Sequence, residues 1–160
     1  MSDAQTILRM IETLHEDRKK DPGAERNLNR AVALYLGWYY YTPSEAKEKW
    51  RGTWKRGAWI HPDDCTNGRP VFCQMHGTDV HRDIPNYIGS RDALKAIRPE
   101  GWLPFCGNRH LKSGDKPFYF GFVTNAAQVI SEDLPTEELA ELHAIIQAIY
   151  YERQTSRRER

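Results

Sequence analysis

The chain has few cysteines, almost no net charge and no long apolar run. Its 160 residues contain no stretch of roughly 18 consecutive apolar residues, so we expect no membrane span. The opening residues 1–5 lack a basic region followed by an apolar one, so we also expect no signal peptide. Three cysteines without disulfide-like spacing favour a reducing cytosol. A net charge of +1 creates no global field that would attract DNA or a membrane, and we expect neither as a partner.

The sequence also lacks a recognisable catalytic motif. It has no Gly-x-Ser-x-Gly, no glycine-rich phosphate loop and no His-Glu-x-x-His. Histidines and cysteines are present, but nothing in their spacing places a nucleophile beside its base. The interpretation we favour is a protein that is not an enzyme, with no catalytic residues and no cofactor. A metal-dependent nuclease or phosphodiesterase that uses the His/Cys residues is a further alternative.

A zinc site is the metal hypothesis that the residues allow. The spacings His61-x3-Cys65 and Cys73-x2-His76 supply four ligands that zinc favours. They match no zinc module, however, and no paired CxxC accompanies them. Scattered loop histidines and small buried cysteines are the alternative, and we therefore expect no metal.

Apolar periodicity and capping residues predict five helices. A stripe at helical spacing predicts the first over residues 5–19, and Asn27 is expected to cap the second, up to Gly37. Residues 42–45 read Thr-Pro-Ser-Glu, a capping box that opens the third. Ser90 is expected to cap a short helix that ends before a proline, and Thr136 the last helix.

The strands are expected between these helices, at residues 59–62, 70–75, 103–106, 118–124 and 126–131. We therefore predict an α+β fold, with an antiparallel sheet of about four strands sandwiched between helices. Residues 23–153 form the expected single domain, after an extra N-terminal helical arm at 1–22 and before a charged, frayed tail at 154–160. Assembly of a homo-oligomer through the arm is one hypothesis, and burial of its stripe on its own domain is the other.

Cationic and aromatic residues interleave in two loops and beside the short helix. Arginine and lysine suit phosphates, while tryptophan and tyrosine faces suit nucleobases. We predict that a small anionic nucleotide binds to residues drawn from these segments, namely Trp54, Arg56, Trp59, His61, Tyr87, Arg91, Arg98, Arg109, His110 and Lys112. The alternative for residues 47–59 is a solvated, salt-bridged helix face whose Trp50 and Trp54 pack on the sheet.

Four dispersed patterns carry a resemblance to a known family. They are Leu36-Gly37-Trp38, the pair Trp59 and Pro62, the set Tyr87, Ser90, Asp92-Ala93-Leu94 and Pro99-Glu100-Gly101-Trp102, and the apolar helix 139–148. Over residues 27–150 the chain resembles the phage ABA-sandwich family of small phage and prophage proteins. The resemblance implies an antiparallel sheet between helical layers, and it implies no known reaction.

The functional hypothesis joins this resemblance to the aromatic and basic loops. We expect a phage accessory protein, acting in the cytoplasm of the infected bacterial host, that counters host defence by binding. Sequestration of a nucleotide immune signal is its most concrete form. The alternative is a protein–protein inhibitor or regulatory adaptor of a host defence protein, with residues 63–84 as the contact surface.

Overall fold

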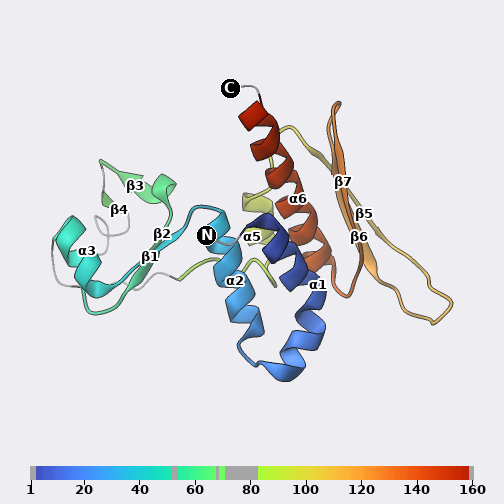
Figure 1. The fold of residues 1–160 in the computed structure, drawn as a ribbon, viewed down its shortest axis with the longest axis horizontal. Coiled ribbons are helices and arrows are strands. Elements are labelled where there is room, and N and C mark those ends of the chain that lie inside the picture. Colours follow the sequence, from blue (N-terminus) through green and yellow to red (C-terminus); the bar gives the residue numbers. More distant parts are fainter. Residues whose placement is uncertain (1–2, 52–53, 68, 71–82, 159–160) are drawn as a thin grey trace. The chain divides into compact units, whose positions relative to one another are not determined.

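A computed structural model describes residues 3–51, 54–67, 69–70 and 83–158 (Figure 1). The chain divides into two compact units. Residues 30–85 form the first, called the small unit below, and residues 2–29 together with 86–160 form the second, the large unit. Helix α2 (Ala24–Tyr35) begins in the large unit and ends in the small unit.

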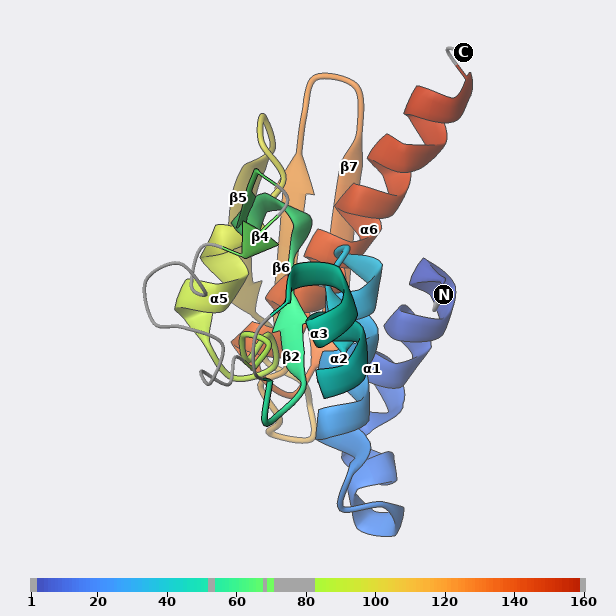
Figure 2. The same cartoon turned by 90° about the vertical axis from the view of Figure 1, so that its left-hand side faces the viewer.

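The large unit is built on a three-stranded antiparallel sheet. Its strands follow one another in the order β5 (Leu103–Asn108), β6 (Phe118–Val123) and β7 (Gln128–Leu134). Helix α6 (Glu137–Arg158) packs on β6 and β7, as both ribbon views show (Figures 1 and 2). The core between them consists of Phe120, Phe122 and Val129 from the sheet and of the apolar face of α6, which includes Leu139, Leu142, Ile145 and Ile146.

Two glycines allow aromatic rings to lie flat on the opposite face of this sheet. A Cβ placed at Gly121 would lie 2.2 Å from Cζ of Phe105, its partner across the ladder. At Gly107 the same atom would lie 2.4 Å from the hydroxyl oxygen of Tyr119. A glycine inside a strand often marks such a close approach of another group to the backbone.

Helix α1 (Ala4–Lys20) belongs to the large unit and packs on α6. The Asp3 carboxylate caps it by accepting from the backbone N–H of Thr6. Its apolar stripe is buried within the chain, at Ala4, Ile7, Ile11 and Leu14. Of the two hypotheses for this helix, burial on its own domain is the one that matches the structure, and the stripe offers no exposed face to a second copy.

The described part of the small unit contains two short antiparallel sheets and helix α3, besides the end of α2. Strand β1 (Tyr39–Tyr41) pairs with β2 (Ala58–Ile60), and β3 (Cys65–Thr66) pairs with β4 (Arg69–Pro70). Helix α3 (Pro43–Trp50) follows β1 directly, with the predicted Thr42–Glu45 capping box formed. A 3-10 turn, η1 (Pro62–Asp64), separates β2 from β3. One apolar cluster of its core consists of Ala46, Trp50, Trp54, Ala58 and Ile60.

The predicted α+β class and the antiparallel pairing are confirmed, although the described strands divide among three sheets instead of gathering in one. Helix α2 begins at Ala24, before the expected cap at Asn27, because the Asp21 side chain already closes the turn by accepting from Gly23 N–H. Helix α6 continues to Arg158, so residues 154–158 are helical. Most of the expected strand 70–75 lies outside the described residues. Within them, no helix is long and apolar enough to cross a bilayer.

Candidate functional site

An aromatic pocket of about 250 Å³ lies in the small unit, between β1, α3 and the turn after β2. The capping box turns the chain so that α3 folds back onto one face of β1. Side chains alternate along a strand, so Tyr39 and Tyr41 share this face while Tyr40 points to the other. The lining residues, called the Tyr39 pocket below, are Tyr39, Tyr41, Lys49, Trp50, Ile60, Pro62 and Cys65.

Three aromatic rings form one wall of the Tyr39 pocket. The ring of Tyr41 lies between the other two, with centroid distances of 4.5 Å to Tyr39 and 4.5 Å to Trp50. Tyr39 is 51% exposed, whereas Trp50 is only 4% exposed. The wall therefore runs from a buried base at Trp50 to a solvent-facing ring at Tyr39, where an incoming planar group can stack.

Lys49 supplies the positive charge of the pocket. Its ammonium donates a hydrogen bond of 2.8 Å to the Tyr41 hydroxyl. It also lies 4.8 Å from the centroid of the Tyr41 ring and 5.3 Å from that of Trp50, within the range of cation–π attraction. No carboxylate is among the described residues that line the pocket, although the Asp64 carboxylate lies near Cys65. The charge is therefore held against two rings, and the described lining adds no carboxylate to it, which suits an anionic group.

Cys65 lines the pocket with an unreactive thiol. Burial, and then the nearby Asp64 carboxylate, raise the pKa of the Cys65 thiol above its ordinary value. A thiol with a raised pKa stays protonated near neutral pH and is a poor nucleophile. The pocket therefore offers shape, aromatic surface and one cation, but no activated nucleophile at this cysteine.

The predicted site residues of the small unit are not among the described residues that line the pocket. Trp54 is buried in the core beside Trp50, and its indole N–H donates to the Arg51 carbonyl. Trp59 is also buried and packs on Tyr40, on the face of the hairpin opposite to Tyr39. Arg56 is exposed.

His61 is held by the backbone on both sides of its ring. Its Nε2 donates to the Leu36 carbonyl at 3.0 Å, while Nδ1 accepts from the backbone N–H of Asp63. The ring also packs on Trp38, with 5.5 Å between the centroids. These contacts give His61 a structural role at the end of β2.

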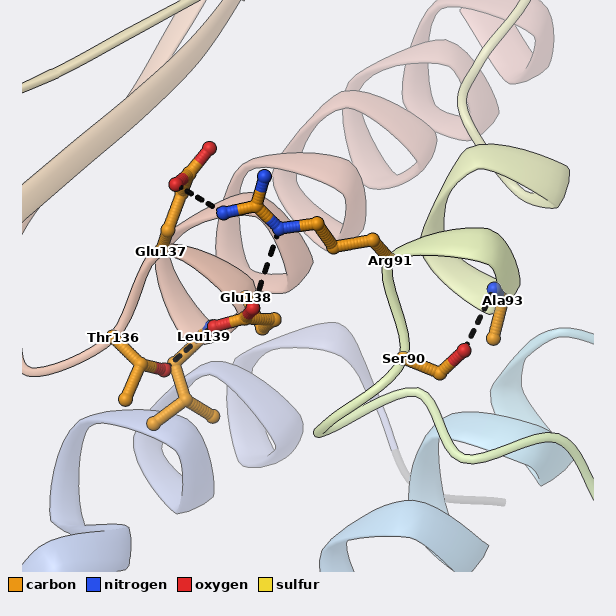
Figure 3. A network of polar contacts seen from close by, with 7 residues as sticks. All are labelled: Ser90, Arg91, Ala93, Thr136, Glu137, Glu138 and Leu139. Carbon is orange, nitrogen blue, oxygen red and sulfur yellow. Dashed lines mark hydrogen bonds and ion pairs between the residues drawn. The ribbon is translucent and has the colours of Figure 1, made fainter.

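In the large unit, two predicted arginines join α5 (Arg91–Ala96) to α6 through glutamates. Arg91 reaches both carboxylates of the first turn of α6, Glu137 and Glu138 (Figure 3). Ser90 and Thr136 cap the two helices at this end by accepting from backbone N–H groups (Figure 3). Arg98, just after α5, donates to Glu141 at 2.6 Å.

The remaining predicted residues of the large unit are separated from one another by their contacts. Tyr87 is almost fully buried, and its backbone N–H donates to the side chain of Asn29. Arg109 pairs with Glu132 across the sheet and lies over the ring of Tyr119. His110 and Lys112 are exposed in the loop between β5 and β6.

None of the described residues that line the pocket belongs to the predicted set. Those that matter most for binding are the cation Lys49 and the aromatic residues Tyr39, Tyr41 and Trp50. Their signal in the sequence is two tyrosines at alternate positions, followed at once by the capping box. A helix that starts directly after a strand has to fold back beside it. Lys49 and Trp50, one helix length later, are then carried to the tyrosine face.

The described residues contain no group of three or more His, Cys, Asp or Glu side chains that could hold a metal ion. Cys73 and His76 of the zinc hypothesis, and most of the proposed contact loop 63–84, lie outside the described residues.

Comparisons of the chain with protein-family models, with curated proteins and with solved structures find no match.

Proposed function

We propose that this protein binds a small nucleotide in the Tyr39 pocket without transforming it. The observation that carries the proposal is the position of Lys49, whose ammonium is fixed against Tyr41 at a pocket whose described lining includes three aromatic rings and no carboxylate. The site differs from the predicted set, but it unites the two chemistries for which that set was chosen, an aromatic face and a cation.

The size of the pocket favours one ring of the ligand as the part that enters. Pockets for whole drug-sized ligands span about 300–1,000 Å³, and this one has about 250 Å³. A nucleobase would stack on the exposed ring of Tyr39, since base–aromatic stacking contributes about 1–3 kcal/mol per base. The sugar and phosphates would then stay outside, where they can approach the Lys49 ammonium.

Binding without turnover suits a protein that sequesters a signal. Such a protein requires a dissociation constant below the concentration of the signal, and it needs no acid–base pair. Together with the resemblance to the phage ABA-sandwich family, the pocket supports a phage accessory protein that removes a nucleotide immune signal in the cytoplasm of an infected bacterium. The same residues would act in any other nucleotide-binding role.

Isothermal titration calorimetry against mononucleotides, cyclic oligonucleotides and ADP-ribose-type nucleotides tests the proposal. We expect at least one class to bind and to be recovered unchanged. The variant Lys49→Met keeps the aliphatic stem and should weaken binding about tenfold or more, because it removes a charge-assisted contact. Lys47→Met is the matched control, since Lys47 is an exposed cation of the same helix that does not line the pocket. Absence of binding by all three classes, or equal losses in both variants, would refute the proposal.

A further inference from the structure

Strand β5 is an edge strand that is exposed on both faces. In the described sheet it pairs only with β6. On one face Leu103 is 69% exposed, and on the other Pro104, Cys106 and Asn108 are all exposed. The strand carries no charged side chain. Natural proteins usually protect such an edge with charges or cover it with another element, because an unpaired neutral strand is a template for further pairing.

The ladder defines which backbone groups of β5 point outward. The N–H of Arg109 donates to the carbonyl of Pro117 at 3.0 Å, continuing the β5–β6 register beyond the strand. Bonded and non-bonded pairs alternate in an antiparallel ladder. Odd-numbered residues of β5 therefore bond to β6, and Pro104, Cys106 and Asn108 direct their backbone groups away from the sheet. The proline at position 104 removes no hydrogen bond between β5 and β6, because a backbone N–H at this position would point away from β6.

The opposite edge of the sheet is protected. At β7 the Gln147 side chain donates a hydrogen bond of 3.1 Å to the carbonyl of Ile130, which points away from β6. The register shifts nearby, where Asp133 has a φ of 59°. A bulge, two acidic side chains and a side-chain hydrogen bond all hinder the addition of a strand at β7. Along β5 the described residues show one protective feature, Pro104, whose missing outward N–H leaves the outward groups of Cys106 and Asn108 free to pair.

We propose that β5 pairs with β5 of a second copy of this chain, antiparallel and centred on Cys106. In this register Cys106 faces Cys106 of the second copy and the two residues exchange two backbone hydrogen bonds. Pro104 faces Asn108 of the second copy at each end of the ladder, so each proline removes only one terminal bond. The two three-stranded sheets then form one sheet of about six strands around a twofold axis.

We infer that the strand added at the edge of β5 comes from a second copy of the chain, because the proposed register is self-complementary. Identical strands satisfy it about one axis, and the strand brings no charge that would oppose a like charge. One pairing also covers the exposed edges of both copies. The inference is independent of nucleotide binding, which concerns residues of the small unit.

Cys106 serves as a probe of the register. In a hydrogen-bonded antiparallel pair the two Cα atoms lie about 5.5 Å apart, within the range that a disulfide spans. With Cys65→Ser and Cys73→Ser as the background, mild oxidation should link two chains through Cys106. The control carries Cys106→Ser and Asn108→Cys in the same background. Its two cysteines would be about 14 Å apart, four residues along the ladder, and should not link.

Sedimentation velocity supplies a second readout that needs no cysteine. Asn108→Pro removes the outward N–H and should raise the dimer dissociation constant about tenfold or more, whereas Asn108→Ala keeps the N–H and should leave it within about twofold. Circular dichroism verifies that both variants fold. A monomer at millimolar concentration, equal cross-linking of the two cysteine positions, or dimerisation that both Asn108 variants leave unchanged would overturn the proposal. Protected Cys106 amide exchange in a monomer would also overturn it, because another segment of the chain would then cover the edge.

Discussion

The ion pair between Arg98 and Glu141 gives the sharpest prediction about stability. The Glu141 side chain is only 4% exposed, and it accepts the 2.6 Å hydrogen bond from Nε of Arg98. The guanidinium, 31% exposed, also lies over the ring of Phe120, 5.7 Å from its centroid. Removal of one partner of a fully buried pair costs about 3–5 kcal/mol, since the remaining charge loses its compensation. Water reaches part of Arg98, so we expect Arg98→Ala to lower the free energy of unfolding by about 2–3 kcal/mol.

Urea unfolding followed by far-ultraviolet circular dichroism measures this loss. Arg91→Ala is the matched control, because Arg91 binds two glutamates of the same helix but is 57% exposed. Exposed pairs contribute about 0–1 kcal/mol, so the control should change stability little. The double variant Arg98→Met with Glu141→Leu should recover most of the loss, because it buries no unpaired charge. A loss for Arg98→Ala no larger than that for Arg91→Ala would refute the reasoning.

Three further substitutions test local features by the same unfolding measurement. Gly121→Ala should lower the free energy of unfolding by about 1–3 kcal/mol, because its Cβ would overlap the ring of Phe105. The loss should be smaller in a chain that also carries Phe105→Ala; equal losses with and without Phe105→Ala would contradict the contact. Thr42→Ala should lower the free energy of unfolding by about 1–2 kcal/mol, because it removes the capping box of α3. Ser44→Ala changes the same turn without removing the cap and should lower it little; similar losses in the two variants would exclude the cap as the cause. His143 has a pKa below its ordinary value, first because it is buried, although its contact with Glu12 acts in the opposite direction. As the pH is lowered, the unfolded chain therefore binds this proton before the folded chain does. The contribution of His143 to the free energy of unfolding is full above about pH 6.5 and is lost as the pH drops toward the pKa of the folded state. His143→Gln should reduce this loss, and an unchanged pH profile of stability would contradict the role of His143.

Local signals in the sequence predicted the features that depend on a few neighbouring residues. The capping box at Thr42 and the caps at Ser90 and Thr136 are formed, because a cap involves only its own first turn. The buried stripe of α1 followed from its spacing alone. Long-range partners could not be predicted in this way. Arg91 and Arg98 were predicted to bind the nucleotide, yet they pair with glutamates that lie 43 to 47 residues further along the chain.

The candidate site shows the same division. The sequence indicated aromatic and cationic residues near 47–59, and Lys49 and Trp50 of the Tyr39 pocket lie in that range. Trp54 and Trp59 were predicted to bind the nucleotide because tryptophan faces suit nucleobases, but both rings are buried in the small unit. Tyr39 and Tyr41 were missed because their role depends on the direction in which α3 folds back, which the periodicity of either element does not encode.

The reciprocal contacts of Phe105 with Gly121 and of Tyr119 with Gly107 also determine how β5 and β6 can align. A slip of one residue would turn every side chain to the wrong face. A slip of two residues in one direction would place the Phe105 and Tyr119 rings opposite each other, and in the other direction would leave the two glycines facing one another with no ring between them. Each ring fits only where the partner strand lacks a side chain. The two ring–glycine pairs therefore fix the register of β5 and β6, so this hairpin has a single favoured strand pairing.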